Sequence, residues 1–191
     1  GDVSSIGRRS EIERFIKWFN KIDNYTYKVF IAGNHDFGFE HGFEIDQEFK
    51  DMGVIYLQDS EVTIDGVKFY GSPWQPEFYD WAFNLPRGEK LAQKWSKIPG
   101  NTDILITHGP VYGLLDYAPH GGHVGCEELY RRVFDVKPKI HVCGHIHGAY
   151  GQKSIEGVEF LNASVLDERY EHAHKPIVVE FNTETKEVVY A

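Results

Sequence analysis

Short apolar runs separated by polar loops recur along this 191-residue chain. Three of them, at 27–32, 103–107 and 139–143, end directly before a glycine or a histidine. Runs of this length that contain Val and Ile and are bounded by turn residues are typical of buried strands. We therefore predict a strand at each of these three positions.

Apolar residues at helical spacing precede each of these strands. One predicted helix begins at Ser10, where Ser10 and Glu13 match a capping box, and runs to about Ile22. Its apolar face carries Ile12, Phe15, Ile16 and Phe19. Two further helices are predicted at 88–97 and 126–136. A helix between parallel strands makes a crossover, which places the carboxyl ends of both strands at the same edge.

Hairpin signals dominate the rest of the pattern. Asp65-Gly66 and Glu156-Gly157 are turn dipeptides, each flanked by short strand-like runs. The further predicted strands are 54–57, 61–64, 67–71, 152–155, 158–161, 177–181 and 188–190. The order of crossovers and hairpins predicts two packed mixed sheets with helices outside, in the α/β or α+β class.

The stretch from Pro73 to Pro86 is predicted to be a long loop without regular structure, and it is rich in aromatic residues. A loop of this length is functional or held by its own side chains. Its aromatic side chains either wall a pocket and stack on a base, or cover the edge of the core, and we favour the second alternative. They are Trp74, Phe78, Tyr79, Trp81 and Phe83.

Metal-competent side chains follow the predicted strands directly. His145 and His147 are one residue apart, so both imidazoles leave the same side of an extended backbone. Alone, this pair equally fits one core and one solvent histidine. Loops after the strands of an α/β sheet gather beyond the carboxyl ends, where ligands bind. The other candidates in such loops are Asp2, Asn34 with His35, and His108.

Four sequence blocks resemble, in order and spacing, signature blocks of the calcineurin-like metallophosphoesterases. They are Gly1-Asp2, Gly33-Asn34-His35-Asp36, Thr107-His108-Gly109-Pro110 and Gly144-His145-Ile146-His147. The stretches Tyr70–Trp74 and Asn84–Gly88 are similar to a narrower branch, the small fetal-brain-type metallophosphoesterase-domain proteins. The family's first block, an Asp-x-His, would lie upstream of Gly1, so we expect a single domain over residues 1–191 that is truncated relative to the family.

The resemblance implies a four-layer αββα sandwich, here lacking the family's first strand, and a site for two divalent ions. Asp2 would bridge the two ions, and Asn34, His108 and His145 would complete one site. His147 would belong to the other site, whose remaining ligands lie in the absent block. Mn, Fe or Zn suits this mixture of ligands.

The same resemblance implies hydrolysis of a small phosphodiester or phosphomonoester, of nucleotide type, by a metal-activated hydroxide. His35 would act as general acid or hydrogen-bond donor to the leaving oxygen, and Asp36 would orient it. His123 and Trp74 are candidate substrate contacts. The competing hypothesis is a module that binds nucleotide or protein but has lost a competent metal centre.

Net charge and cysteine content limit the classes of partner and the compartment that we expect for this protein. The formal charge of −9 argues against a broad grip on extended nucleic acid. Two cysteines provide no disulfide framework, which suits a reducing cytoplasm. No apolar run approaches the length needed to span a membrane. A small phosphorylated substrate remains the expected partner.

Overall fold

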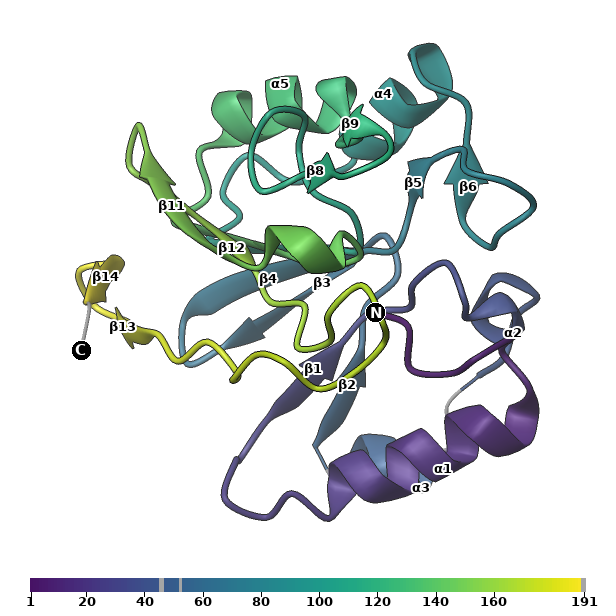
Figure 1. Ribbon diagram of the computed structural model, residues 1–191. Coiled ribbons are helices and arrows are strands. Elements are labelled where there is room, and N and C mark those ends of the chain that lie inside the picture. The colour runs from purple at the N-terminus through teal and green to yellow at the C-terminus, as the bar shows by residue number, and fades with distance from the viewer. Residues whose placement is uncertain (45–46, 52, 190–191) are drawn as a thin grey trace.

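A six-stranded mixed sheet organises the structure, a computed structural model that describes residues 1–44, 47–51 and 53–189. The strand order is β11-β12-β10-β7-β4-β3 (Figure 1). The four inner strands run parallel, and the two edge strands are antiparallel to their neighbours. In chain order they are β3 (Ser60–Ile64), β4 (Val67–Ser72), β7 (Ile104–Thr107), β10 (Ile140–Cys143), β11 (Gly151–Ile155) and β12 (Val158–Asn162).

Both edge strands are joined to the sheet by the predicted turns. Asp65 and Gly66 have φ of +50° and +78°, and Glu156 and Gly157 have φ of +50° and +80°. Two consecutive left-handed residues are the signature of a type I′ turn, which matches the twist of the strands on either side. The two hairpin predictions are therefore confirmed.

Helices cover the outer faces. Helices α4 (Glu89–Trp95) and α5 (Glu127–Val136) pack on one face of the six-stranded sheet, where Trp95 and Leu129 join Leu105 in the largest apolar cluster. On the other side of the molecule lies a parallel pair, β1 (Lys28–Phe30) and β2 (Val54–Tyr56). Three helices accompany this pair: α1 (Arg9–Asn20), α2 (Phe37–Glu40) and α3 (Gln47–Asp51).

The resulting order of layers is helices, six-stranded sheet, β1–β2 pair and helices (Figure 1). The predicted α/β class with helices outside is confirmed. The sheet layer opposite the six-stranded sheet differs from the prediction, because the described residues there form short two-stranded pairs rather than one mixed sheet. One is β1–β2, and the other is the antiparallel pair β13 (Glu180–Asn182) and β14 (Glu187–Val189). Strand β13 is shorter than the predicted 177–181, whereas β14 begins one residue before the predicted 188–190, of which Tyr190 lies outside the described residues.

Helix α1 begins earlier than predicted. Gly7, with φ of +75°, turns the chain, and the helix starts at Arg9. Glu11 therefore occupies the third helical position, and its Oε2 accepts a hydrogen bond from the backbone N–H of Arg8 at 3.0 Å. Glu13 instead accepts from the side chain of Arg9 at 2.7 Å. The predicted capping box of Ser10 and Glu13 is wrong, because the turn at Gly7 sets the first residue of the helix.

The aromatic stretch 73–86 has regular structure after all. Strands β5 (Gln75–Pro76) and β6 (Asn84–Leu85) pair in parallel. Phe83 is fully buried, and Trp74 packs edge-on against it at 5.4 Å between ring centroids. These two rings cover the core, as the favoured alternative predicted, whereas Phe78 and Tyr79 are exposed.

The remaining short elements lie beside the carboxyl ends of the central strands. They are β8 (Tyr117–Ala118), β9 (Gly122–His123) and the 3₁₀ helix η1 (His147–Ala149). Among the described helices, none is both long enough and apolar enough to cross a bilayer.

Candidate metal centre

Four metal-competent side chains from four separate segments converge at the carboxyl end of the parallel strands. Asp2, His108 and His145 each offer a ligand atom, and these atoms all lie within 4.8 Å of one another. The amide oxygen of Asn34 lies 2.7 Å from Nε2 of His108. Asp2 comes from the N-terminal segment, and the others follow β1, β7 and β10. The structure thus brings together the four residues predicted for one metal site.

Close backbone approach makes this convergence feasible. A Cβ added at Gly33 would collide with a carboxylate oxygen of Asp2 and lie 2.6 Å from Cε1 of His108. The N–H of Gly144 donates to the carbonyl of His108 at 2.9 Å, which joins the loops after β10 and β7. His145 itself has φ of +68°, a left-handed conformation that is strained for a residue other than glycine. Such strain is common where a functional side chain must be aimed.

Burial keeps the two central imidazoles neutral. It lowers the pKa of His108 well below the usual value, and it lowers the pKa of His145 to about 3. Nδ1 of His108 is buried and has no hydrogen-bond partner within the described part of the chain. A neutral imidazole is the form that binds metals. A carboxylate, an amide oxygen and two neutral imidazoles therefore fit a divalent ion.

His147 lies at the margin of this cluster. Its Nδ1 is 2.8 Å from the carbonyl oxygen of Asp167, and a carbonyl can only accept, so Nδ1 carries the proton. Nε2 is then left with a free lone pair, the arrangement in which metal-binding histidines are usually held. The assignment of His147 to a second metal ion stays a prediction.

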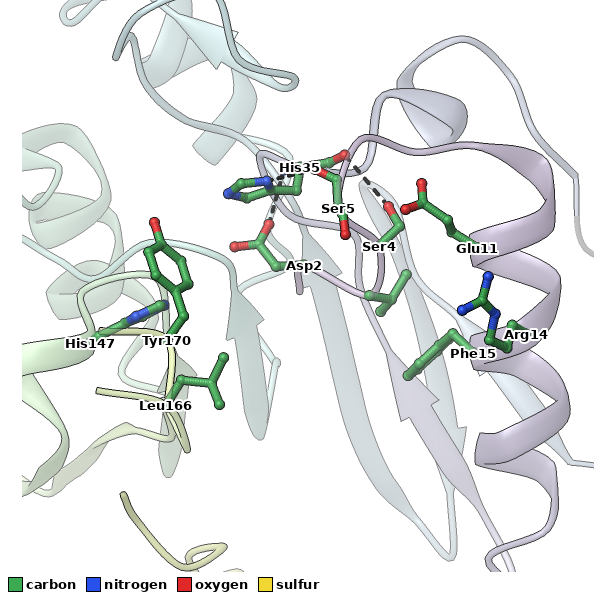
Figure 2. A pocket seen from close by; sticks show the side chains of 11 residues that line it. Asp2, Ser4, Ser5, Glu11, Arg14, Phe15, His35, His147, Leu166 and Tyr170 are labelled. Atoms are coloured by element: carbon green, nitrogen blue, oxygen red, sulfur yellow. Dashed lines mark hydrogen bonds between the residues drawn. The ribbon is translucent and has the colours of Figure 1, made fainter. Parts of the chain in front are cut away.

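His35 is held beside the cluster by the carboxylate of Asp2 and the backbone carbonyl of Ser5. Its N–H donates to Oδ1 of Asp2 at 3.0 Å, and its ring Nδ1 lies 2.8 Å from the carbonyl oxygen of Ser5 (Figure 2). The Ser5 carbonyl therefore fixes the proton on Nδ1, and Nε2 is available to a substrate. The ring also packs against Trp81 at 4.3 Å between centroids.

Asp36 has a different role from the one predicted. Its fully buried carboxylate accepts hydrogen bonds from the backbone N–H groups of Gly33 at 2.8 Å, Val3 at 3.1 Å and Ser4 at 2.9 Å. Burial raises the pKa of this carboxyl, and the hydroxyl of Ser4 opposes that shift. Asp36 thereby fastens the segment that carries Asp2 to the loop after β1. The prediction that it orients His35 is wrong, because Ser5 does so.

A cleft of about 790 Å³ opens over the cluster. Its walls include Trp81, for which a place in a pocket wall was the less favoured alternative. They also include residues that the sequence patterns did not single out as substrate contacts: Arg87, His120, Glu168 and Tyr170. The guanidinium of Arg87 donates to the carbonyls of Val124 at 2.9 Å and Gly125 at 2.7 Å, so its charge is fixed in place. Trp81 and Arg87 lay within stretches already noted, whereas Tyr170 lay in a charged loop that gave no signal.

The two predicted substrate contacts lie outside this cleft. Nε1 of Trp74 donates to Asp59 at 2.9 Å, and the ammonium of Lys94 lies 3.8 Å from the centre of its ring. Nδ1 of His123 is 2.7 Å from a carboxylate oxygen of Asp116. Packing and hydrogen bonds thus direct both side chains elsewhere, which corrects the prediction that they contact substrate.

Residues that could hold a divalent ion lie at the carboxyl ends of parallel strands in a helix-flanked mixed sheet, which is the arrangement of a metal-binding α/β protein. Residues 1–149 match the family described as calcineurin-like phosphoesterase, and the chain belongs to this family. It is 42% identical over 207 residues to human metallophosphoesterase domain-containing protein 1, covering 96% of this chain and 63% of that protein. It is 35% identical to UPF0046 protein T07D4.2 of Caenorhabditis elegans, covering 94% of this chain and 52% of that protein.

The chain therefore spans less than two thirds of the length of these relatives. Among solved structures, it resembles TT1561 of Thermus thermophilus with a TM-score of 0.62 at 10% identity, covering 99% of this chain and 82% of that one. At that identity, the likeness concerns the fold. Family membership supports metal-dependent phosphoester hydrolysis, and this family generally binds divalent metals.

Proposed function

We propose that this chain hydrolyses a small phosphodiester or phosphomonoester of nucleotide type, using two divalent ions of Mn, Fe or Zn. The observation that carries the proposal is the convergence of Asp2, Asn34, His108 and His145 on the floor of a cleft of about 790 Å³. That volume suits a small molecule. The overall negative charge disfavours an extended nucleic acid as substrate.

The chemistry divides between bound metal and side chains. Divalent ions bound here would supply a water of lowered pKa and neutralise charge on the phosphoryl oxygens. Burial keeps the imidazoles of His108 and His145 neutral, and Asp36 fixes the segment that carries Asp2. When His35 carries a proton on both ring nitrogens, Nδ1–H stays on the Ser5 carbonyl and Nε2–H donates its proton to the leaving oxygen, which leaves the neutral imidazole.

The same proposal includes the class of substrate and the cellular compartment of the protein. We expect a small phosphorylated or nucleotide substrate and no membrane partner. Cys126 and Cys143 are both buried and free. Free thiols suit a cytoplasmic location.

Turnover of bis-p-nitrophenyl phosphate with added Mn²⁺ tests the proposal. We expect hydrolysis by the wild-type chain and none above background after His108→Ala. Hydrolysis that is the same in both proteins would contradict the proposal. Retained metal and phosphate binding without any turnover would instead favour the competing hypothesis of a non-catalytic binding module.

A further inference from the structure

A short loop from Leu166 to His172 forms one wall of the cleft. Its two ends form an antiparallel bridge, and the N–H of Asp167 donates to the carbonyl of Glu171 at 2.9 Å. The side chain of Asp167 accepts from the N–H groups of Arg169 at 2.8 Å and Glu171 at 3.0 Å. The loop is therefore closed by hydrogen bonds of its own backbone and of one aspartate, and it holds Tyr170 at its tip.

Tyr170 has a left-handed backbone conformation at the tip of this loop. Its φ is +62°, and the residue is 69% exposed. A bulky residue in the left-handed region costs on the order of 1–3 kcal/mol. Its hydroxyl has no hydrogen-bond partner among the residues that the structure describes. The hydrogen bond from its N–H to the Asp167 carbonyl and the contact of its ring with His147 hold this conformation, so the exposed ring has a fixed position at the cleft.

The ring of Tyr170 is coupled to the predicted metal ligand His147. The two rings meet edge to face, with centroids 5.2 Å apart and an interplanar angle of 83°. The carbonyl of Asp167 accepts both the N–H of Tyr170, at 3.0 Å, and Nδ1–H of His147, at 2.8 Å. One backbone carbonyl thus sets the positions of both side chains.

Tyr170 lies on the wall of the two clefts that adjoin the metal cluster. Tyr170 lines the cleft of about 790 Å³ and also an adjoining cleft of about 490 Å³, and the two share Asp2, His35 and His147. Figure 2 shows the ring of Tyr170 beside Asp2, with the hydroxyl pointing past Asp2 at the end of the ring nearer to His35. A phenolic hydroxyl is a neutral hydrogen-bond donor. In this position it can reach a phosphoryl group held over the metal cluster.

We propose that Tyr170 is a catalytic residue that donates a hydrogen bond from its hydroxyl to a phosphoryl oxygen of the substrate. This inference rests on the proposed phosphoesterase function. Negative charge on the phosphoryl oxygens must be stabilised in the transition state, and a fixed donor aimed at them lowers the barrier. Tyr170 keeps its proton throughout, so protonation of the leaving oxygen remains the role of His35.

The test uses Tyr170→Phe in the full chain loaded with Mn²⁺, because this change removes the hydroxyl and keeps the ring on His147. We expect kcat for bis-p-nitrophenyl phosphate to fall roughly 10- to 100-fold, less than for a fully buried donor because Tyr170 is exposed. Inhibition by orthovanadate, which mimics the transition state of phosphoryl transfer, should weaken by a similar factor. Metal content by elemental analysis should not change.

Tyr117→Phe is the matched control. Tyr117 is also an exposed tyrosine, at 57%, but it does not line the cleft, so its variant should keep wild-type kcat. The inference is overturned if Tyr170→Phe turns over within about twofold of wild type, or if its loss of activity is accounted for by loss of metal. An equal loss in Tyr117→Phe would overturn it as well.

A separate measurement distinguishes failure of this inference from failure of the proposed function. If the wild-type chain shows no turnover, the proposed function fails, and calorimetric binding of inorganic phosphate to the Mn²⁺-loaded protein tests Tyr170 alone. Weaker phosphate binding by Tyr170→Phe than by wild type supports the donor role. Equal binding by both proteins overturns it.

Discussion

The floor and the rim of the cleft position their side chains by different means. The floor consists of Asp2, Asn34, His108 and His145, which are placed by backbone segments in direct contact. The rim consists of the exposed loops 77–81 and 166–172, which are held by a few hydrogen bonds from Asn84 and Asp167.

This difference follows from what each region must do, which is to bind metal in the floor and to exchange substrate at the rim. Metal ligands must keep fixed distances, so the floor is close-packed and tolerates little change in volume. The rim must admit and release a substrate, so its rings stay exposed and depend on local hydrogen bonds. We therefore expect substitutions in the floor to abolish the site, and those in the rim to modify its use.

The largest effect should come from removing floor ligands. His108→Ala and His145→Ala should each lose metal from this site and lower turnover by roughly 10³-fold or more, because the metal supplies several kcal/mol of transition-state stabilisation. Elemental analysis and turnover of the same samples check this. Undiminished metal content in both variants would show that these histidines do not bind it.

His35 lies between the floor and the rim. Its removal should lower turnover without a matching loss of bound metal. His35→Ala should lower turnover by roughly 10²–10⁴-fold, the usual contribution of a general acid, with metal content nearly unchanged. The loss should shrink for esters with good leaving groups, because these need little protonation. An equal loss for good and poor leaving groups would indicate that His35 only positions the substrate.

Adding a single methyl group at Gly33 should show whether the floor is close-packed. Gly33→Ala places a Cβ against Asp2 and His108, so we expect a loss of about 1–3 kcal/mol in the free energy of unfolding and weaker metal binding. Gly100→Ala is the control, since nothing lies within 4 Å of a Cβ at that position. Denaturant titration of both variants measures the difference. Equal stability of the two would mean that the floor is not close-packed.

The smallest effect is expected at the rim. The side-chain amide of Asn84 donates to the carbonyls of Phe78 at 3.2 Å and Tyr79 at 2.6 Å. Asn84→Ala should cost about 1 kcal/mol of stability and raise KM while leaving kcat and metal content close to wild type. Steady-state kinetics with bis-p-nitrophenyl phosphate check this. A loss of metal in this variant would show that the rim also determines metal binding, which contradicts the prediction.

Local patterns were enough to predict much of this protein. The apolar runs and the helical spacing of apolar residues predicted the ends of the central strands and helices to within a few residues. This works because buried side chains recur at a short, fixed spacing along a strand or a helix. The turn dipeptides Asp65-Gly66 and Glu156-Gly157 determined two hairpins by their tolerance of positive φ. The resemblance of the signature blocks named Asp2, Asn34, His108 and His145, and the last three of these stand shortly after β1, β7 and β10.

Only the tertiary structure decided the partners of those residues. Asp36 bonds to Val3 and Ser4, more than thirty positions away, and no local pattern predicts such a contact. Trp74 follows a strand near the site, yet Asp59 and Lys94 hold it outside the cleft. Tyr170 reaches the cleft because Asp167 closes a loop and also contacts His147. The sequence determines which side chains are available and the local periods that bury them, whereas long-range hydrogen bonds and packing determine which side chains meet.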